Sequence, residues 1–434
     1  MHGFLNSKAA CPHFPPEIWL QIFQFATYVP NVLVPEIYDH SSTIGWLFNR
    51  DNYRAVQDSL VTKRYLVRVC KMWYILASPY LYRSIYLGRG RCLSSLCSTL
   101  MNSARGTHPF SGERPLGSWT ERLDIAMRDQ SLTHGDLELD FLAEAIRCMP
   151  NLAIVSFAVR TPQYDHFTLP SSVVDALLTH ALSLRVIDWA SDSQDRLYPT
   201  DLHYAALLAS ATGLRVVNHV FSFVNPPSTC YPIAPSLQTL SLSSMLLEEA
   251  YSRDTNLFPS LREIVYHHVH LSSEALRSFL STYGANLTSV HFIDDTCSPH
   301  IDLGTELAQL SVYCPRLRSL VLSVQKWAVL PPHFDLPPLH YFGLRSNQKQ
   351  APGWGYAPVF AALQGLHQSA PTLRVVRFTD RYNVVDMRKK HAHFRRGLES
   401  LRDCHFRVED HEGRLLLQDV HSQSGEGSSL TERL

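Results

Sequence analysis

The chain has 434 residues, of which 45% are hydrophobic and 18% are charged, a composition typical of a folded protein rather than a disordered one. Its 39 basic and 39 acidic side chains balance, so it lacks the basic excess that is typical of nucleic-acid-binding proteins. No apolar run approaches the roughly 18 residues needed to span a bilayer, and we expect no membrane partner. Nine cysteines without a CxxC pair, and no apparent secretory signal, predict a cytoplasmic or nuclear location.

The first predicted element is a short helix that follows a tail over residues 1–13. Pro15 and Pro16 suit a helix start, where a missing N–H costs nothing, and Glu17 is favourable near the positive end of the helix dipole. Apolar residues then follow as one broad stripe: Ile18, Trp19, Ile22, Phe23 and Ala26. Pro30 is expected to stop this helix.

A second apolar stripe at helical spacing comes later in the chain. Its members are Leu66, Val69, Cys70, Trp73, Leu76 and Ala77. Ser78 and Pro79 predict a cap and a new turn of helix, and residues 85–87 are expected to be extended. Residues 29–61 indicate mostly loop, with a short helix over 51–60. Both helical segments carry more apolar residues than so small a bundle can bury, which favours a docking surface.

These two segments resemble an F-box, over residues 14–88. Pro15, Glu17, Ile18, Ile22 and Phe23 match its opening, L-P-x-E-[IL]-x-x-x-I-F, and residues 69–77 match its second half as V-C-K-x-W-Y-x-L-A. An ordinary F-box is contiguous, whereas here an insertion at about 29–61 separates the halves. The arrangement is similar to the split F-boxes of fungal proteins.

The resemblance implies docking on a Skp-type adaptor and, through it, on a cullin. The adaptor-binding residues that it implies are Pro15, Glu17, Ile18, Ile22, Phe23, Val69, Cys70, Trp73 and Leu76. Some of these must instead form the F-box's own core, and the sequence does not sort them. The alternative is that the helices merely cap the domain that follows.

A degenerate repeat occupies residues 119–420, after a predicted linker helix and loop over 89–118. The unit is Leu-x-x-Φ-x-Φ, where Φ is apolar, and its leucine recurs every 22 to 34 residues. The leucines are Leu152, Leu184, Leu214, Leu237, Leu261, Leu287, Leu317, Leu339, Leu373 and, more weakly, Leu401.

Helical patterns separate these units, so the predicted fold class is α/β: the F-box followed by an irregular leucine-rich-repeat-like solenoid, with parallel strands inside and helices outside. The usual asparagine or cysteine ladder is mostly absent, so the resemblance to leucine-rich repeats is partial. An ordinary α/β domain whose strands begin with leucine is the alternative. Residues 421–434 are expected to be a flexible tail.

Strand residues between the apolar ones would face the concave side of such an array. The substrate-binding candidates among them are Glu263, His267, His291, Tyr341, Arg345 and Arg377. Asp188, Asn218, Ser241 and His405 occupy similar predicted positions. No charge sign dominates, which favours a protein or peptide ligand over a phosphate backbone.

No motif of a nucleophilic hydrolase, a phosphate-binding loop, a zinc protease or a dinucleotide-binding turn is present. His267 and His268 are adjacent, so on a strand they would point to opposite faces and not converge on a metal. We therefore expect no catalytic residue, metal or cofactor. The F-box resemblance implies a non-enzymatic substrate receptor of an SCF-type E3 ubiquitin ligase that recruits an unknown protein. An F-box scaffold without degradation and an enzyme with an unrecognised site remain alternatives.

Overall fold

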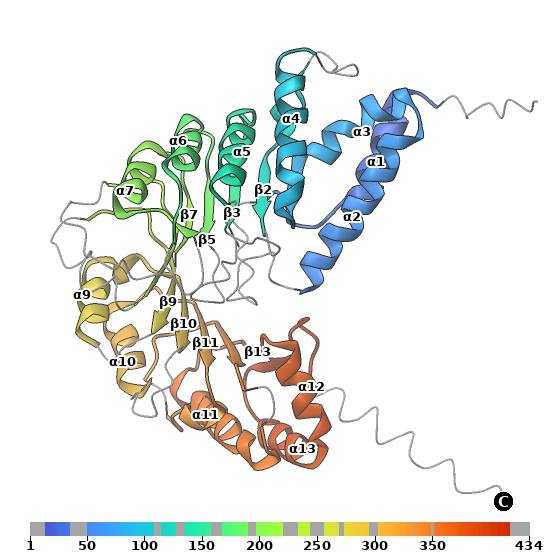
Figure 1. Cartoon of the computed structure of the whole chain (residues 1–434). Helices are drawn as coiled ribbons and strands as arrows, with labels where there is room; N and C mark the ends of the chain where they lie inside the picture. The colour runs from blue at the N-terminus through green and yellow to red at the C-terminus, as the bar shows by residue number, and fades with distance from the viewer. Residues whose placement is uncertain are drawn as a thin grey trace, which may run out of the picture.

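The computed structural model describes residues 14–34, 50–107, 114–126, 135–157, 167–189, 197–219, 233–243, 256–268, 273–294, 303–333, 335–348 and 351–416. Strands line the inner side of an arc and helices cover its outer side (Figure 1). One end of the arc carries a helical unit made of α1 (Pro16–Thr27), α2 (Arg50–Val69) and α3 (Lys71–Arg83). The predicted α/β class with parallel strands inside and helices outside is confirmed.

The main sheet contains twelve described strands, and every adjacent pair of strands in it is parallel. They are β1 (Ser84–Leu87), β2 (Arg122–Ile125), β3 (Ile154–Phe157), β5 (Val186–Trp189), β7 (Val216–His219), β8 (Thr239–Ser243), β9 (Glu263–His268), β10 (Ser289–Asp294), β11 (Ser319–Val324), β12 (Tyr341–Ser346), β13 (Val375–Phe378) and β14 (Arg407–Glu409). A separate two-stranded ribbon pairs β4 (Phe167–Thr168) with β6 (Leu197–Tyr198). Strand order that follows chain order is typical of a solenoid.

The outer layer consists of one helix for most turns of the chain. The described helices are α4 (Leu93–Ala104), α5 (Gly135–Arg147), α6 (Ser171–Thr179), α7 (Asp201–Ser210), α9 (Ser273–Tyr283), α10 (Leu303–Tyr313), α11 (Ala357–Ser369), α12 (Arg381–Lys389) and α13 (His391–Ser400). Polar side chains fix several starts: Thr200 accepts from the His203 N–H, and Asp380 accepts from the N–H groups of Tyr382 and Asn383.

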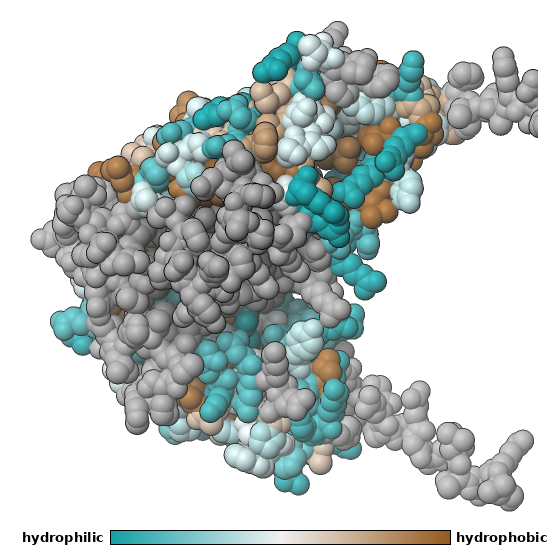
Figure 2. All heavy atoms as spheres, in the orientation of Figure 1, coloured by the Kyte–Doolittle hydropathy of each residue, from teal (hydrophilic) through white to brown (hydrophobic). Residues whose placement is uncertain are grey.

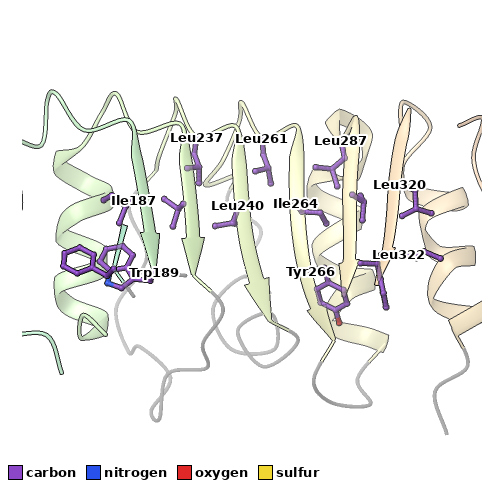
Figure 3. Packing of buried hydrophobic residues seen from close by; sticks show 14 of the residues in the cluster. Ile187, Trp189, Leu237, Leu240, Leu261, Ile264, Tyr266, Leu287, Leu320 and Leu322 are labelled. Carbon is purple, nitrogen blue, oxygen red and sulfur yellow. The ribbon is translucent and has the colours of Figure 1, made fainter. Parts of the chain in front are cut away.

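The repeated leucines form a continuous ladder between the sheet and the helices. From Leu152 to Leu373, each repeat leucine is at most 1% exposed. Figure 3 shows Leu237, Leu261 and Leu287 at one level, and Leu240 beside Ile264 at the next. Because no single turn could bury this apolar edge alone, the turns stabilise one another.

The repeat begins earlier than predicted, because its first two turns lack the leucine. The strand register places Tyr82 and Thr120 at the positions equivalent to Leu152. Both β1 and β2 nevertheless keep the two apolar positions that follow, such as Leu123 and Ile125, which are buried. The segment over 85–87 is extended, as predicted, but it is also the first strand of the sheet.

The weakest predicted unit, at residues 401–406, was wrong in register. Val376 pairs with Val408, so His405 and not Leu401 occupies the leucine position, and His405 does not lie on the concave face. Its Nδ1 lies 2.9 Å from Nδ1 of His367 on α11 instead.

The helical unit also differs from the prediction at two points. The α2 helix runs unbroken through the second part of the insertion, and it ends where Cys70 turns extended and starts α3. Pro79 was expected to begin a new turn, but it lies inside α3, where it costs one backbone hydrogen bond.

Each end of the sheet packs on a further part of the chain. Tyr86 of β1 packs on the cluster of Val29 and Val56 from the helical unit. At the other end, Leu415 bridges back to Glu409 of β14, and the Leu416 N–H donates to the Val408 carbonyl. Pairing of this kind at β14 protects a strand edge from association with other chains.

Candidate functional site

The two separated halves of the F-box-like motif pack against each other in the helical unit. Trp19 of α1 and Trp73 of α3 lie with ring centroids 4.7 Å apart, and Phe23 stands edge-on to Trp73 at 4.9 Å. Ala77 completes this small core, and the Tyr80 hydroxyl donates to the Leu20 carbonyl at 3.0 Å. The insertion therefore does not prevent the halves from forming one cluster.

The helix that begins in the insertion contributes to the same unit. The Ser59 hydroxyl of α2 donates to the Thr27 carbonyl at the end of α1, at 2.7 Å. Val56 packs on Val29 in the loop that follows α1. These contacts satisfy one carbonyl at the carboxyl end of α1 and hold α2 beside it.

An apolar face remains uncovered on this unit. Ile18 is 39% exposed and Ile22 is 41% exposed, one helical turn apart on α1. Val69, Met72 and Ile75 are also exposed, where α2 ends and α3 begins. Of the 19 exposed large apolar side chains among the described residues, 11 lie between Phe14 and Ile75, and Figure 2 shows apolar surface gathered there. Apolar patches of this kind mark interaction sites in proteins.

The structure sorts the predicted adaptor-binding residues into two groups. The exposed ones are Pro15, Glu17, Ile18, Ile22, Val69 and Cys70. The others belong to the core: Phe23 is fully buried, and Trp73 and Leu76 are partly buried against it. Phe23 therefore has no surface for a partner and supports the exposed face from behind.

Four of the predicted substrate-binding residues on the concave face contact a side chain of a neighbouring strand. Glu263 Oε1 lies 3.5 Å from His291 Nε2, and Arg377 forms a 2.6 Å ion pair with Glu409. The Arg377 guanidinium also lies over the Tyr341 ring, 5.7 Å from its centroid. These contacts join neighbouring strands across the face and hold the side chains in fixed positions.

Accessibility separates these candidates as well. Tyr341, Arg345 and Arg377 are partly exposed, whereas His267 and His291 are buried and present no surface to a ligand. The hydroxyls of Ser241, Ser289 and Ser323 are buried here without a hydrogen-bond partner in the described part of the chain. Buried hydroxyls in this state are available to water or to a bound group.

The first half of the same face contains a row of buried polar side chains. The Asn218 amide donates to Asp188 at 2.8 Å, and the Ser156 hydroxyl donates to its other oxygen at 3.3 Å. Burial raises the pKa of Asp188 to about 7, which the hydrogen bond from Asn218 partly opposes. Burial also raises the pKa of Asp124, although Arg122 favours its charged form.

Sequence reasoning placed Asp188 and Asn218 on this face but missed Arg122 and Asp124, because β2 was not recognised. Arg122 Nε donates to Asp124 at 2.8 Å, and Nη1 donates to the carbonyl of Val32 in the helical unit, also at 2.8 Å. The sequence signal for this pair was a basic and an acidic residue two positions apart, at 122 and 124, which would share one face of a strand. Removing one partner of a buried ion pair leaves an uncompensated charge, so Arg122 and Asp124 depend on each other.

The described residues contain no group of three or more histidine, cysteine, aspartate or glutamate side chains arranged to hold a metal ion. The six cysteines that the structure describes are free thiols. Among the helices described, none is long and apolar enough to cross a membrane. His267 and His268 both lie on β9.

Comparison with known proteins gave no match for this chain, either among protein-family models or among curated proteins.

Proposed function

We propose that this chain is a substrate-receptor subunit of an SCF-type ubiquitin ligase. In this account the apolar face of the helical unit docks on a Skp-type adaptor, and the concave face of the solenoid holds the protein to be ubiquitinated. The chain acts by tethering, which raises the concentration of its client near a ubiquitin-loaded enzyme, and performs no bond chemistry itself.

The observation that carries this proposal is the reassembly of a split motif around its own core with an apolar face left over. Trp19, Phe23 and Trp73 account for the core, so Ile18, Ile22 and Val69 are not needed to hold the unit together. Exposure of isoleucine and valine side chains to water is unfavourable, and a partner that covers them would gain roughly 25 cal/mol for each Å² of apolar surface buried.

The attachment of the helical unit also supports a tethering role. The α3 helix continues directly into β1, and Arg122 and Tyr86 hold the loop after α1 against the first strands. A receptor that positions its client for transfer needs a rigid connection between its two binding surfaces.

Affinity purification of the intact chain from its own cells tests the proposal. We expect a Skp-type adaptor and a cullin to be recovered with it, together with a client whose abundance rises when the proteasome is inhibited. Recovery of the adaptor with no such client would favour an F-box scaffold. Recovery of neither adaptor nor cullin would contradict the proposal.

A further inference from the structure

A groove of about 430 Å³ lies where the helical unit meets the first turns of the solenoid. One wall comes from Leu33 in the loop after α1, and another from Trp119 in the 3-10 turn η3 (Leu116–Trp119). The remaining walls come from Ile154 at the start of β3 and from Leu182 and Arg185, which precede β5. Its size fits one large apolar side chain with the backbone on either side of it.

The neutral polar groups along this groove are already satisfied by the chain itself. The Asn151 amide donates to the Ser118 carbonyl at 2.7 Å, and the Ser183 hydroxyl donates to the Leu152 carbonyl at 2.8 Å. Glu121 is held by Arg83 through two hydrogen bonds, the shorter at 2.9 Å. What remains for a ligand is therefore apolar surface and unbalanced charge.

That unbalanced charge is positive. Arg114 and Arg185 line the groove, both are exposed, and neither has an acidic partner among the described residues. The Arg114 guanidinium lies over the Trp119 ring, 5.2 Å from its centroid, which holds its N–H groups at the rim. Leu182 is 82% exposed beside them, an unusual state for leucine.

The geometry points to a second docking site, for an extended acidic segment of a partner protein that carries a large apolar side chain between carboxylates. The apolar side chain enters between Leu33, Trp119 and Leu182, and the flanking carboxylates pair with Arg114 and Arg185. A nucleic acid would need a longer basic track and no apolar wall. The site is separate from the exposed face of α1, and it does not depend on the proposed adaptor.

Selection of a random peptide display library on the immobilised full chain tests this site. The same selection is run on a double variant, Arg114→Glu with Arg185→Glu, and on Leu182→Ser, which alters an exposed side chain only. Arg402→Glu, an exposed arginine elsewhere, is the matched control. Thermal melting of all four proteins establishes that each one folds.

We expect peptides rich in aspartate and glutamate around one leucine, phenylalanine or tryptophan to be enriched on the native chain and on Arg402→Glu. The leading peptide, labelled with fluorescein, should bind the double variant and Leu182→Ser at least tenfold more weakly by fluorescence polarisation. The site is excluded if no acidic peptides are enriched, or if they bind the double variant as tightly as the native chain.

Discussion

Arg122 reaches from β2 to the helical unit and donates to the backbone carbonyl of Val32 at 2.8 Å, while the same guanidinium pairs with buried Asp124. One side chain thus ties the sheet to the segment between α1 and α2. The contact fixes how the exposed apolar face is presented relative to the concave face.

Replacing Arg122 should therefore lower the stability of the folded chain. Arg122→Met leaves the Asp124 carboxylate buried without its counter-ion, and we expect a loss of about 3–5 kcal/mol in the free energy of unfolding. Urea denaturation followed by tryptophan fluorescence measures it. The exposed pair of Arg83 and Glu121 is the matched control, and Arg83→Met should cost about 1 kcal/mol or less. Equal losses for the two variants would refute the structural role assigned to Arg122.

Asp188 should make the stability of the solenoid depend on pH. Because burial raises its pKa to about 7, the folded chain binds a proton that the unfolded chain releases near the ordinary aspartate pKa of about 4. This contribution is complete below that lower value and is lost as the pH rises through 7. Asp188→Asn should flatten the melting temperature between pH 4 and 7 and raise it at pH 8.

Asp175→Asn, on the exposed side of α6, is the control for this prediction and should leave the pH profile unchanged. A profile that Asp188→Asn does not alter would show that Asp188 stays charged in the folded chain.

Substitutions in the helical unit should distinguish its buried core from its exposed face by their effects on stability. Phe23→Ala removes a fully buried ring that packs against both Trp19 and Trp73, and we expect it to lower the free energy of unfolding by about 3–5 kcal/mol. Ile22→Ala, on the neighbouring exposed position, should cost well under 1 kcal/mol. Hydrogen exchange of α1 and α3 measures both. Similar protection in the two variants would contradict the packing described.

Substitutions on the concave face should lower the recovery of the client and leave the recovery of the adaptor unchanged. Tyr341→Ala with Arg345→Glu removes two partly exposed side chains, and we expect the client to be lost from affinity purifications while the adaptor is retained. Arg277→Glu, exposed on the outer helix α9, should change neither. Quantitative mass spectrometry reads out both partners. Undiminished client recovery from the concave variant would place client binding elsewhere.

The fold was predictable wherever the leucine frame is intact, because a buried leucine two residues before each strand is a local signal. The same frame failed at both ends of the sheet, where Tyr82, Thr120 and His405 replace that leucine. Tertiary contacts define those turns instead, through the helical unit at one end and the bridge from Leu415 at the other.

The candidate site was predictable in its residues but not in their roles. Ile18 and Trp19 are neighbours on one apolar stripe, and only the position of α3 decides that Trp19 is buried and Ile18 is left exposed. The burial of His291 and the link from Arg122 to Val32 likewise depend on strands that are distant in sequence.

Direct binding of the purified full chain to a purified Skp-type adaptor, measured by calorimetry, is the sharpest test of the proposed function. The test variant is Ile18→Asp with Ile22→Asp, and the control is Val312→Asp, another exposed apolar position, on α10. We expect the native chain and the control to bind alike and the test variant to bind about a hundredfold more weakly. No binding by the native chain, or undiminished binding by the folded test variant, would contradict the account.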